Sequence, residues 1–98
     1  MIKTFKCKET EKIWNGNFSK KFPADLQGKK DNIIKRKLYL IDAAESWRDL
    51  IIPSGNKLEA LKGDRQGQYS IRINQKYRIC FRFINGDCFH VEVVDYHH

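Results

Sequence analysis

The chain has 98 residues, 41% of them hydrophobic and 12% aromatic, which is enough for one packed core but too little for two. We therefore predict a single domain over residues 1–98. The net charge of +7 favours a polyanionic partner, either a nucleic acid or an acidic protein surface.

Three cysteines, Cys7, Cys80 and Cys88, form an odd set without C-x-x-C spacing. This pattern argues against a disulfide framework and against a four-ligand zinc site, so we predict reduced thiols and a cytoplasmic location. Lysines interrupt the first residues too often for a signal peptide, and no later apolar run approaches the length of a membrane span. We therefore expect neither secretion nor contact with a membrane.

The first predicted elements are a strand and a short helix. In a strand over residues 2–7, Ile2, Thr4 and Lys6 would face one side and Lys3, Phe5 and Cys7 the other, a pattern consistent with a first strand that joins the later sheet. Residues 9–15 are typical of a short helix that buries Ile13 and Trp14 and ends at Gly16.

A long helix is predicted next, because Pro23 suits a first helical position and apolar residues recur at helical spacing from Leu26 to Trp47. Most lysines and arginines of this segment fall outside the apolar stripe. They form either a solvated face, which we favour, or a nucleic-acid surface. Residues 42–44 are a point where the segment can divide into two helices, and residues 53–56 end it with turn chemistry.

Residues 69–73, 77–83 and 89–93 alternate apolar odd positions with mostly polar even ones, which predicts three antiparallel strands. A two-residue turn would pair odd positions with even ones and direct arginines toward the core. We therefore expect connections of three residues, or bulges, despite the turn signal of Asn85-Gly86.

The polar face of these strands carries the strongest functional signal. If Ile73 pairs with Tyr77 across a three-residue turn, Arg72 lies directly opposite Arg78, and such like charges cost stability unless an anion lies between them. The same parity places Tyr96 on this face. The face is either simply hydrated or a solvent-open surface for an anion.

Positive charge is concentrated in this part of the chain. Residues 57–82 hold seven cations and two acids, and the charged residues of the last sixteen positions are all acidic, histidines aside. A phosphate backbone is the natural complement. The seven cations are Lys57, Lys62, Arg65, Arg72, Lys76, Arg78 and Arg82.

The segment before the first of these strands contains Gly63 and Gly67, which allow sharp turns, and Glu59 and Lys62 can then face the same cleft. No nucleotide-binding, serine-hydrolase or zinc-protease motif is present. The three histidines are His90, His97 and His98, and their bunching near one end disfavours metal-assisted hydrolysis. We expect no metal and no cofactor.

Several motifs occur together: Met1-Ile2-Lys3-x-Phe5, Leu61-Lys62-Gly63-Asp64-Arg65-x-Gly67, Ser70-Ile71-x-Ile73, Tyr77-Arg78-Ile79-x-Phe81, Asn85-Gly86-Asp87 and Asp95-Tyr96-His97. In this combination the chain resembles the HigB toxins of the RelE/ParE superfamily. The resemblance implies an α+β fold, with an N-terminal strand and two to three helices packed on an antiparallel sheet. It also implies a bacterial type II toxin that a HigA-like helix-turn-helix antitoxin neutralises, with operator DNA contacted only through the toxin–antitoxin complex.

The same resemblance implies a ribosome-dependent endoribonuclease that cuts translated mRNA at the 30S decoding site without a metal ion. Carried over by motif, the catalytic surface comprises Lys62, Arg78, Tyr96 and His97, with Asp95 beside them. Glu59 stands where some relatives carry histidine, so the general base is either Glu59 or a neighbouring group. The remaining cations, Lys57, Arg65, Arg72, Lys76 and Arg82, become candidate RNA-binding residues.

This assignment fits the chemistry of RNA cleavage. When a ribose 2′-hydroxyl attacks the adjacent phosphate, charge builds on the phosphoryl oxygens, and Arg78 and Lys62 would stabilise that charge. His97 would protonate the leaving 5′-oxygen, and Tyr96 would orient the RNA or stack on a base. Two other classes remain open: a ParE-like inhibitor of DNA gyrase and an RNA-binding module without enzymatic activity.

Overall fold

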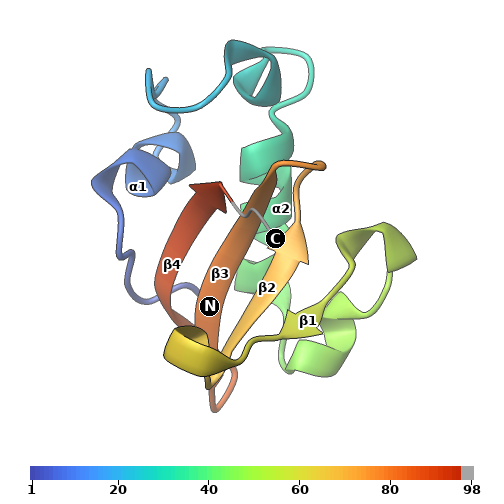
Figure 1. Ribbon diagram of the computed structural model, residues 1–98. Helices are drawn as coiled ribbons and strands as arrows, with labels where there is room; N and C mark the ends of the chain where they lie inside the picture. Colours follow the sequence, from blue (N-terminus) through green and yellow to red (C-terminus); the bar gives the residue numbers. More distant parts are fainter. Residues whose placement is uncertain (96–98) are drawn as a thin grey trace.

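The computed structural model describes residues 1–95. Its centre is a four-stranded antiparallel sheet in the order β1-β2-β3-β4 (Figure 1), and its strands are β1 (Glu59–Ala60), β2 (Gln68–Arg72), β3 (Tyr77–Ile84) and β4 (Asp87–Asp95). Two helices, α1 (Lys8–Trp14) and α2 (Ile33–Ala43), pack on this sheet. The predicted α+β fold is thus confirmed. Within residues 1–95, the helices are too short or too polar to span a bilayer.

The core lies between the sheet and the helices, as the alternation of apolar residues predicts. Ile71, Ile79 and Phe81 are fully buried on the helix-facing side of the sheet. Ile34 and Leu38 of α2 pack in the same cluster and are equally buried. The odd-numbered positions of β2 and β3 therefore face the core, which leaves the arginines at even positions on the opposite face.

The prediction of one long helix from Pro23 is wrong. Residues after Pro23 form only the 3-10 turn η1 (Ala24–Gln27), and the backbone is extended at Gly28, with φ −66° and ψ 155°. The helix α2 begins later, where the side chain of Asn32 accepts a hydrogen bond from the Lys35 amide at 3.0 Å. Residues 28–32 offer no apolar side chain to the core, so this side-chain cap decides where the helix starts.

The predicted division at residues 42–44 is confirmed, because α2 ends at Ala43 and the chain continues through two further 3-10 turns. These are η2 (Trp47–Leu50), which Ser46 and Asp49 close with a capping box, and η3 (Ser54–Asn56). A fourth 3-10 turn, η4 (Gly63–Arg65), connects β1 to β2.

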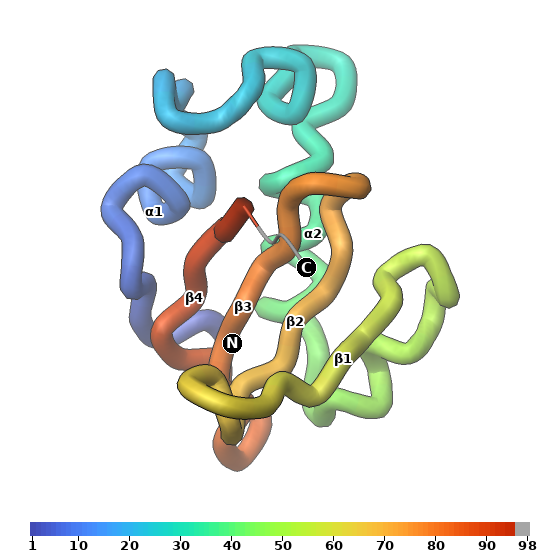
Figure 2. The backbone as a smooth tube through the Cα atoms, in the orientation of Figure 1, coloured from blue at the N-terminus to red at the C-terminus, as the bar shows by residue number. Residues whose placement is uncertain are grey.

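The predicted N-terminal strand is only partly formed. The first residues run alongside β4, as Figure 2 shows, and make parallel bridges from Ile2 to Cys88 and from Phe5 to Val91. The bridges lie three residues apart on both segments, whereas a regular ladder repeats every two, so no continuous strand results. The segment nevertheless covers the outer edge of β4 and leaves β1 as the other edge of the sheet.

The first hairpin has the predicted geometry. The Ile73 amide donates to the Tyr77 carbonyl at 3.0 Å, which leaves a three-residue turn at residues 74–76. The pairing continues from this turn, and Arg72 lies opposite Arg78.

The second hairpin, between β3 and β4, contains both a two-residue Asn-Gly turn and a bulge. Asn85 and Gly86 form a two-residue turn with φ values of 50° and 84°, as in a type I′ turn. A bulge in β4 then places two residues, His90 and Val91, against Phe81 and restores the parity. The expectation of a bulge is confirmed, but the expected core position of Phe89 is wrong. The turn sets Phe89 opposite Arg82, and Cys88 enters the core instead.

Candidate RNA-binding and catalytic site

The candidate site is the sheet face opposite the helices. Arg72 and Arg78 are direct cross-strand partners, so their side chains leave the sheet on the same side, as predicted. Arg82 lies four residues after Arg78 on the same strand and shares this face. The strand register therefore gathers three guanidinium groups from two adjacent strands.

Arg78 is buried within this face, and this corrects the expectation of a solvent-open site. The residue is only 7% exposed. Its Nε donates to Ser70 Oγ at 2.7 Å, and its Nη2 donates to the carbonyls of Ser70, at 3.3 Å, and Lys57. With these partners the guanidinium has a fixed orientation, as is required of a preorganised positive group.

Glu59 supplies the negative charge next to Arg78. The Glu59 Oε1 atom lies 3.8 Å from Arg78 Nη1, and the glutamate side chain is 45% exposed. β1 holds it there by pairing Glu59 with Ser70. Lys57 has a left-handed backbone, with φ 46° and ψ 52°, and its carbonyl accepts from Arg78. The result is a solvent-accessible carboxylate beside a shielded guanidinium.

The other predicted cations surround this pair to different extents. Lys57 and Lys62 are exposed, and Lys62 is the residue that precedes η4. Arg72 is partly exposed beside Arg78. Lys76 lies in the turn at residues 74–76, 5.5 Å from the centre of the Tyr77 ring.

Asp95 lies apart from Arg78, because it pairs with Tyr77, whose ring packs on the core side. Its Oδ2 atom is 3.6 Å from Lys76 Nζ. The register thus places Asp95 on the helix-facing side of the sheet, and the β4 residue directly opposite Arg78 is Val94. Tyr96 and His97, two of the predicted catalytic residues, lie outside the described residues.

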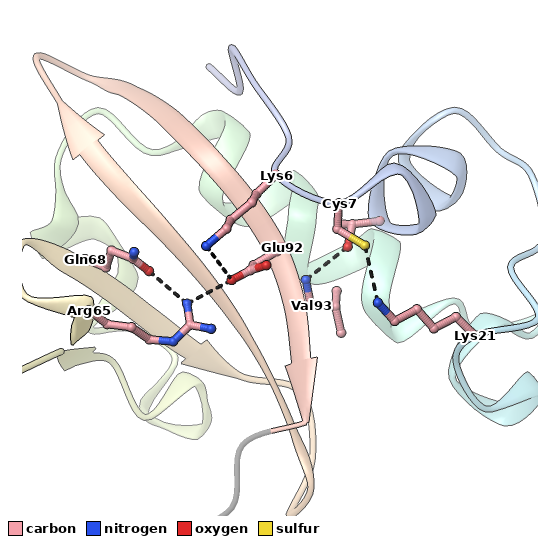
Figure 3. A network of polar contacts seen from close by, with 8 residues as sticks. Lys6, Cys7, Lys21, Arg65, Gln68, Glu92 and Val93 are labelled. Carbon is pink, nitrogen blue, oxygen red and sulfur yellow. Dashed lines mark hydrogen bonds and ion pairs between the residues drawn. The ribbon is translucent and has the colours of Figure 1, made fainter. Parts of the chain in front are cut away.

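Arg65 is part of a polar network that crosses the sheet (Figure 3). Its Nη1 atom donates to Gln68 Oε1 at 3.2 Å and lies 2.8 Å from Glu92 Oε1. Lys6 Nζ is 3.9 Å from the same carboxylate oxygen. The loop that carries Arg65 therefore spans from the β1 side to β4, and Cys80 beneath this network is fully buried. The middle of the polar face is thus covered rather than hydrated.

Sequence reasoning missed Ser70, Gln68, Lys6 and Glu92 as parts of this face. Ser70 had a usable signal, because the register that pairs Arg72 with Arg78 also sets Ser70 diagonally next to Arg78. Lys6 had none, because its position depends on where the N-terminal segment lies along β4.

Among residues 1–95, no three His, Cys, Asp or Glu side chains are grouped so that they could hold a metal ion. A mostly apolar hollow of about 540 Å³ lies beside β1, lined by Trp47, Ile51, Ser54, Leu58, Ala60 and Tyr69.

The three cysteines differ in reactivity. Burial raises the pKa of the Cys80 thiol to about 11 and that of the Cys88 thiol to about 12. Partial burial also opposes ionisation of Cys7, but hydrogen bonds from Thr10 and Glu9 and the nearby Lys21 ammonium outweigh it and lower the Cys7 pKa. Figure 3 shows Lys21 pointing at Cys7, with Nζ 3.7 Å from Sγ.

We expect iodoacetamide to label Cys7 of the folded protein on the order of 100-fold faster than Cys80 or Cys88 near neutral pH, because the thiolate is the reacting species. Peptide mass spectrometry after timed labelling measures the three rates separately. Labelling in denaturant is the control, where the rates should converge. Comparable labelling of Cys80 in the folded state would contradict the described burial.

Two solved structures contain chains with the same architecture. The fold resembles chains in two structures of the YoeB–YefM complex from Staphylococcus aureus, one of them described as a heterotetrameric toxin–antitoxin complex. The TM-scores are 0.59 and 0.54, with sequence identities of 18% and 20%, and each match covers 100% of this chain and 97% of the other. At this identity the likeness establishes the fold.

The sequence identifies the family. Residues 3–97 match the family described as the RelE-like toxin of the type II toxin–antitoxin system HigB, and the chain belongs to this family. It is 36% identical to "Endoribonuclease HigB" of Proteus vulgaris over 97 residues, which cover 99% of this chain and 100% of that protein. It is 45% identical to "Toxin HigB-1" of Vibrio cholerae over 56 residues, a match that spans 57% of this chain and 59% of the relative.

Proposed function

We propose that the protein is an endoribonuclease toxin that cleaves translated mRNA on the ribosome and so inhibits translation and growth. The observation that carries this proposal is the pair formed by Arg78 and Glu59, in which an oriented guanidinium lies 3.8 Å from an accessible carboxylate. The full-length similarity to a relative named as an endoribonuclease supports the same reaction.

The proposed reaction is attack of a ribose 2′-hydroxyl on the adjacent phosphate, without a metal ion. Glu59 is half exposed and accepts the 2′-hydroxyl proton, since a general base must reach that proton directly or through one water. The Arg78 guanidinium and the Lys62 ammonium stabilise the charge that develops on the phosphoryl oxygens. In this proposal His97 protonates the leaving 5′-oxygen and Tyr96 orients the RNA or stacks on a base.

A HigA-like helix-turn-helix antitoxin is the proposed partner, and operator DNA is contacted only through that complex. Support comes from the family and from the structural neighbours, which were solved as toxin–antitoxin complexes. Because its substrate would be a translating ribosome, we propose that the protein acts in the cytoplasm.

The test is an incubation of the purified protein with three substrates: mRNA on programmed ribosomes, the same mRNA alone, and supercoiled DNA with gyrase. We expect cuts in the mRNA on ribosomes, little cutting of free mRNA and no effect on gyrase. Gyrase inhibition without mRNA cleavage would instead favour the ParE-like class. RNA binding with a salt slope near −0.7 per phosphate and no cleavage would favour a binding module.

A further inference from the structure

A hollow lined by basic residues lies on the same sheet face as the candidate catalytic residues but at the other end of β3. It has a volume of about 250 Å³, and Lys6, Gln68, Arg82 and His90 line it. Arg82 comes four residues after Arg78 on one strand, so the two α-carbons are about 13 Å apart. Because Ser70 and the Lys57 carbonyl fix the Arg78 guanidinium on the side of β3 that faces β2, the hollow is a separate cationic site.

The guanidinium of Arg82 lies beside the backbone of Gly67. Gly67 has φ +90°, and a Cβ built on it would lie 2.7 Å from Arg82 Nη1. The guanidinium thus lies close to the backbone at Gly67, whose positive φ itself favours glycine. Within residues 1–95, Arg82 has no ion pair or hydrogen bond, so its charge and donors are available to a ligand.

The charge around the hollow stays positive after its ion pairs are counted. Glu92 is the acid of the neighbouring network, and both Arg65, at 2.8 Å, and Lys6, at 3.9 Å, approach its Oε1 atom. Gln68 Oε1 accepts a hydrogen bond from Arg65, which leaves the amide NH₂ group of Gln68 as a donor beside Arg82. A ligand with several acceptor oxygens and negative charge fits these groups.

The β4 bulge adds His90 to the rim. His90 has a left-handed backbone with φ 55°, a conformation that is unfavourable for a residue with a side chain. A hydrogen bond from its amide to Thr4 Oγ1, at 2.8 Å, secures it. Such strain is retained where the surrounding structure requires it, and here it places an exposed imidazole beside two cations.

We propose that this hollow binds a phosphate group of an RNA strand, separate from the phosphate at which cleavage occurs. The proposal rests on the proposed function for the identity of the strand. Proteins that hold single-stranded nucleic acid contact successive phosphates along its backbone, and Arg82 lies on the same sheet face as the Arg72–Arg78 pair, four residues farther along β3. Binding here would fix the register of the strand relative to Arg78 and Glu59.

The experiment measures binding of a ten-nucleotide 2′-O-methyl RNA, which cannot undergo 2′-hydroxyl attack, by fluorescence anisotropy at several salt concentrations. Arg82→Gln keeps most of the side chain and removes its charge. We expect it to weaken binding by about tenfold and to reduce the salt slope by about 0.7, the value for one lost phosphate contact on a single strand. Lys30→Ala removes one exposed charge outside this face and should leave affinity unchanged.

The same variants are tested with message-free ribosomes, and Arg82→Lys is included because it retains the charge. If Arg82→Gln binds the oligonucleotide more weakly, the message supplies the phosphate. If Arg82→Gln binds only the ribosomes more weakly, ribosomal RNA supplies it. Partial rescue by Arg82→Lys supports a phosphate contact in either case. Thermal unfolding of each variant checks that the fold is retained.

The proposal is overturned if Arg82→Gln binds both RNAs as tightly as Lys30→Ala does, or if only its affinity for the antitoxin falls. Cleavage by the wild type together with unchanged binding by Arg82→Gln would reject the second phosphate site and leave the nuclease intact. Weakened binding by Arg82→Gln without any cleavage by the wild type would keep the site and reject the nuclease.

Discussion

Replacing Arg78 with alanine is expected to lower the single-turnover cleavage rate on programmed ribosomes by about 100-fold or more. The estimate follows from the loss of one preorganised donor to a developing oxyanion, which typically costs two to three orders of magnitude. Arg78 meets the requirement for preorganisation, because Ser70 and Lys57 fix its orientation before any substrate arrives.

Arg78→Ala also has a structural consequence that must be separated from the chemical one. Ser70 is fully buried, and without the guanidinium its hydroxyl loses its partner, so unfolding should become easier by about 1–3 kcal/mol. Ser70→Ala is the matched control, since it removes the support but keeps the charge. We expect Ser70→Ala to lose stability like Arg78→Ala but to retain much more cleavage.

Rates should be measured below the unfolding temperature of every variant, with near-native circular dichroism as the condition for comparison. A near-wild-type rate in folded Arg78→Ala would refute the catalytic role of Arg78. If Ser70→Ala and Arg78→Ala lost cleavage equally, Arg78 would be a positioning residue that holds β1 and Glu59 in place.

The second large effect concerns a buried lysine under η3. Lys37 is 7% exposed, and its Nζ donates to Oδ1 of the fully buried Asn56 at 2.6 Å. Asn56 in turn donates to the Leu50 carbonyl at 3.2 Å. Asn56→Ala should therefore destabilise the protein by about 3 kcal/mol, because it leaves a buried ammonium without its acceptor.

Urea denaturation of wild type, Asn56→Ala, Lys37→Met and the double variant tests this effect. Lys37→Met removes the ammonium, so adding Asn56→Ala to it should cost much less than adding it to the wild type. Equal costs in the two backgrounds would show that Lys37 and Asn56 do not interact.

The same lysine should make stability depend on pH in the alkaline range. Burial, and secondarily the charge of Arg36, lower the pKa of Lys37 below its ordinary value of 10.5. Between the lowered folded-state pKa and 10.5, the unfolded chain binds more protons than the folded one, so stability rises with pH there. The difference in unfolding free energy between wild type and Lys37→Met should therefore move in favour of the wild type across this window. A difference that is flat with pH would contradict the assignment.

The alternation of odd and even positions along residues 69–83 predicted how β2 and β3 pair and which face of each strand is buried. The three-residue turn before Tyr77 fixed the pairing of Arg72 with Arg78, and a one-residue error would have reversed both faces. The start of α2 was less accessible, because the Asn32 cap competes with a proline signal and an apolar stripe that both suggest an earlier start. The position of Phe89 opposite Arg82 was not predicted, because it results from a two-residue Asn-Gly turn together with a separate bulge in β4.

The pairing of Arg72 with Arg78 was predicted from the sequence, but the burial of Arg78 and the residues that cover it were not. Charge and register pointed to Arg78, whereas its enclosure depends on Lys57 and Glu59, which reach it from a separate segment of the chain. Local patterns do not encode such long-range covering. The contacts of Arg65 and Lys6 with Glu92 were missed for the same reason, because they join residues that are far apart in the sequence.

The most direct measurement of the central claim is a map of mRNA ends after controlled expression of the wild type and of Arg78→Ala. The account predicts new ends inside translated reading frames with the wild type, and their disappearance with a folded Arg78→Ala protein. Growth arrest by the wild type without cuts in translated frames, or the same cuts with Arg78→Ala, would contradict it.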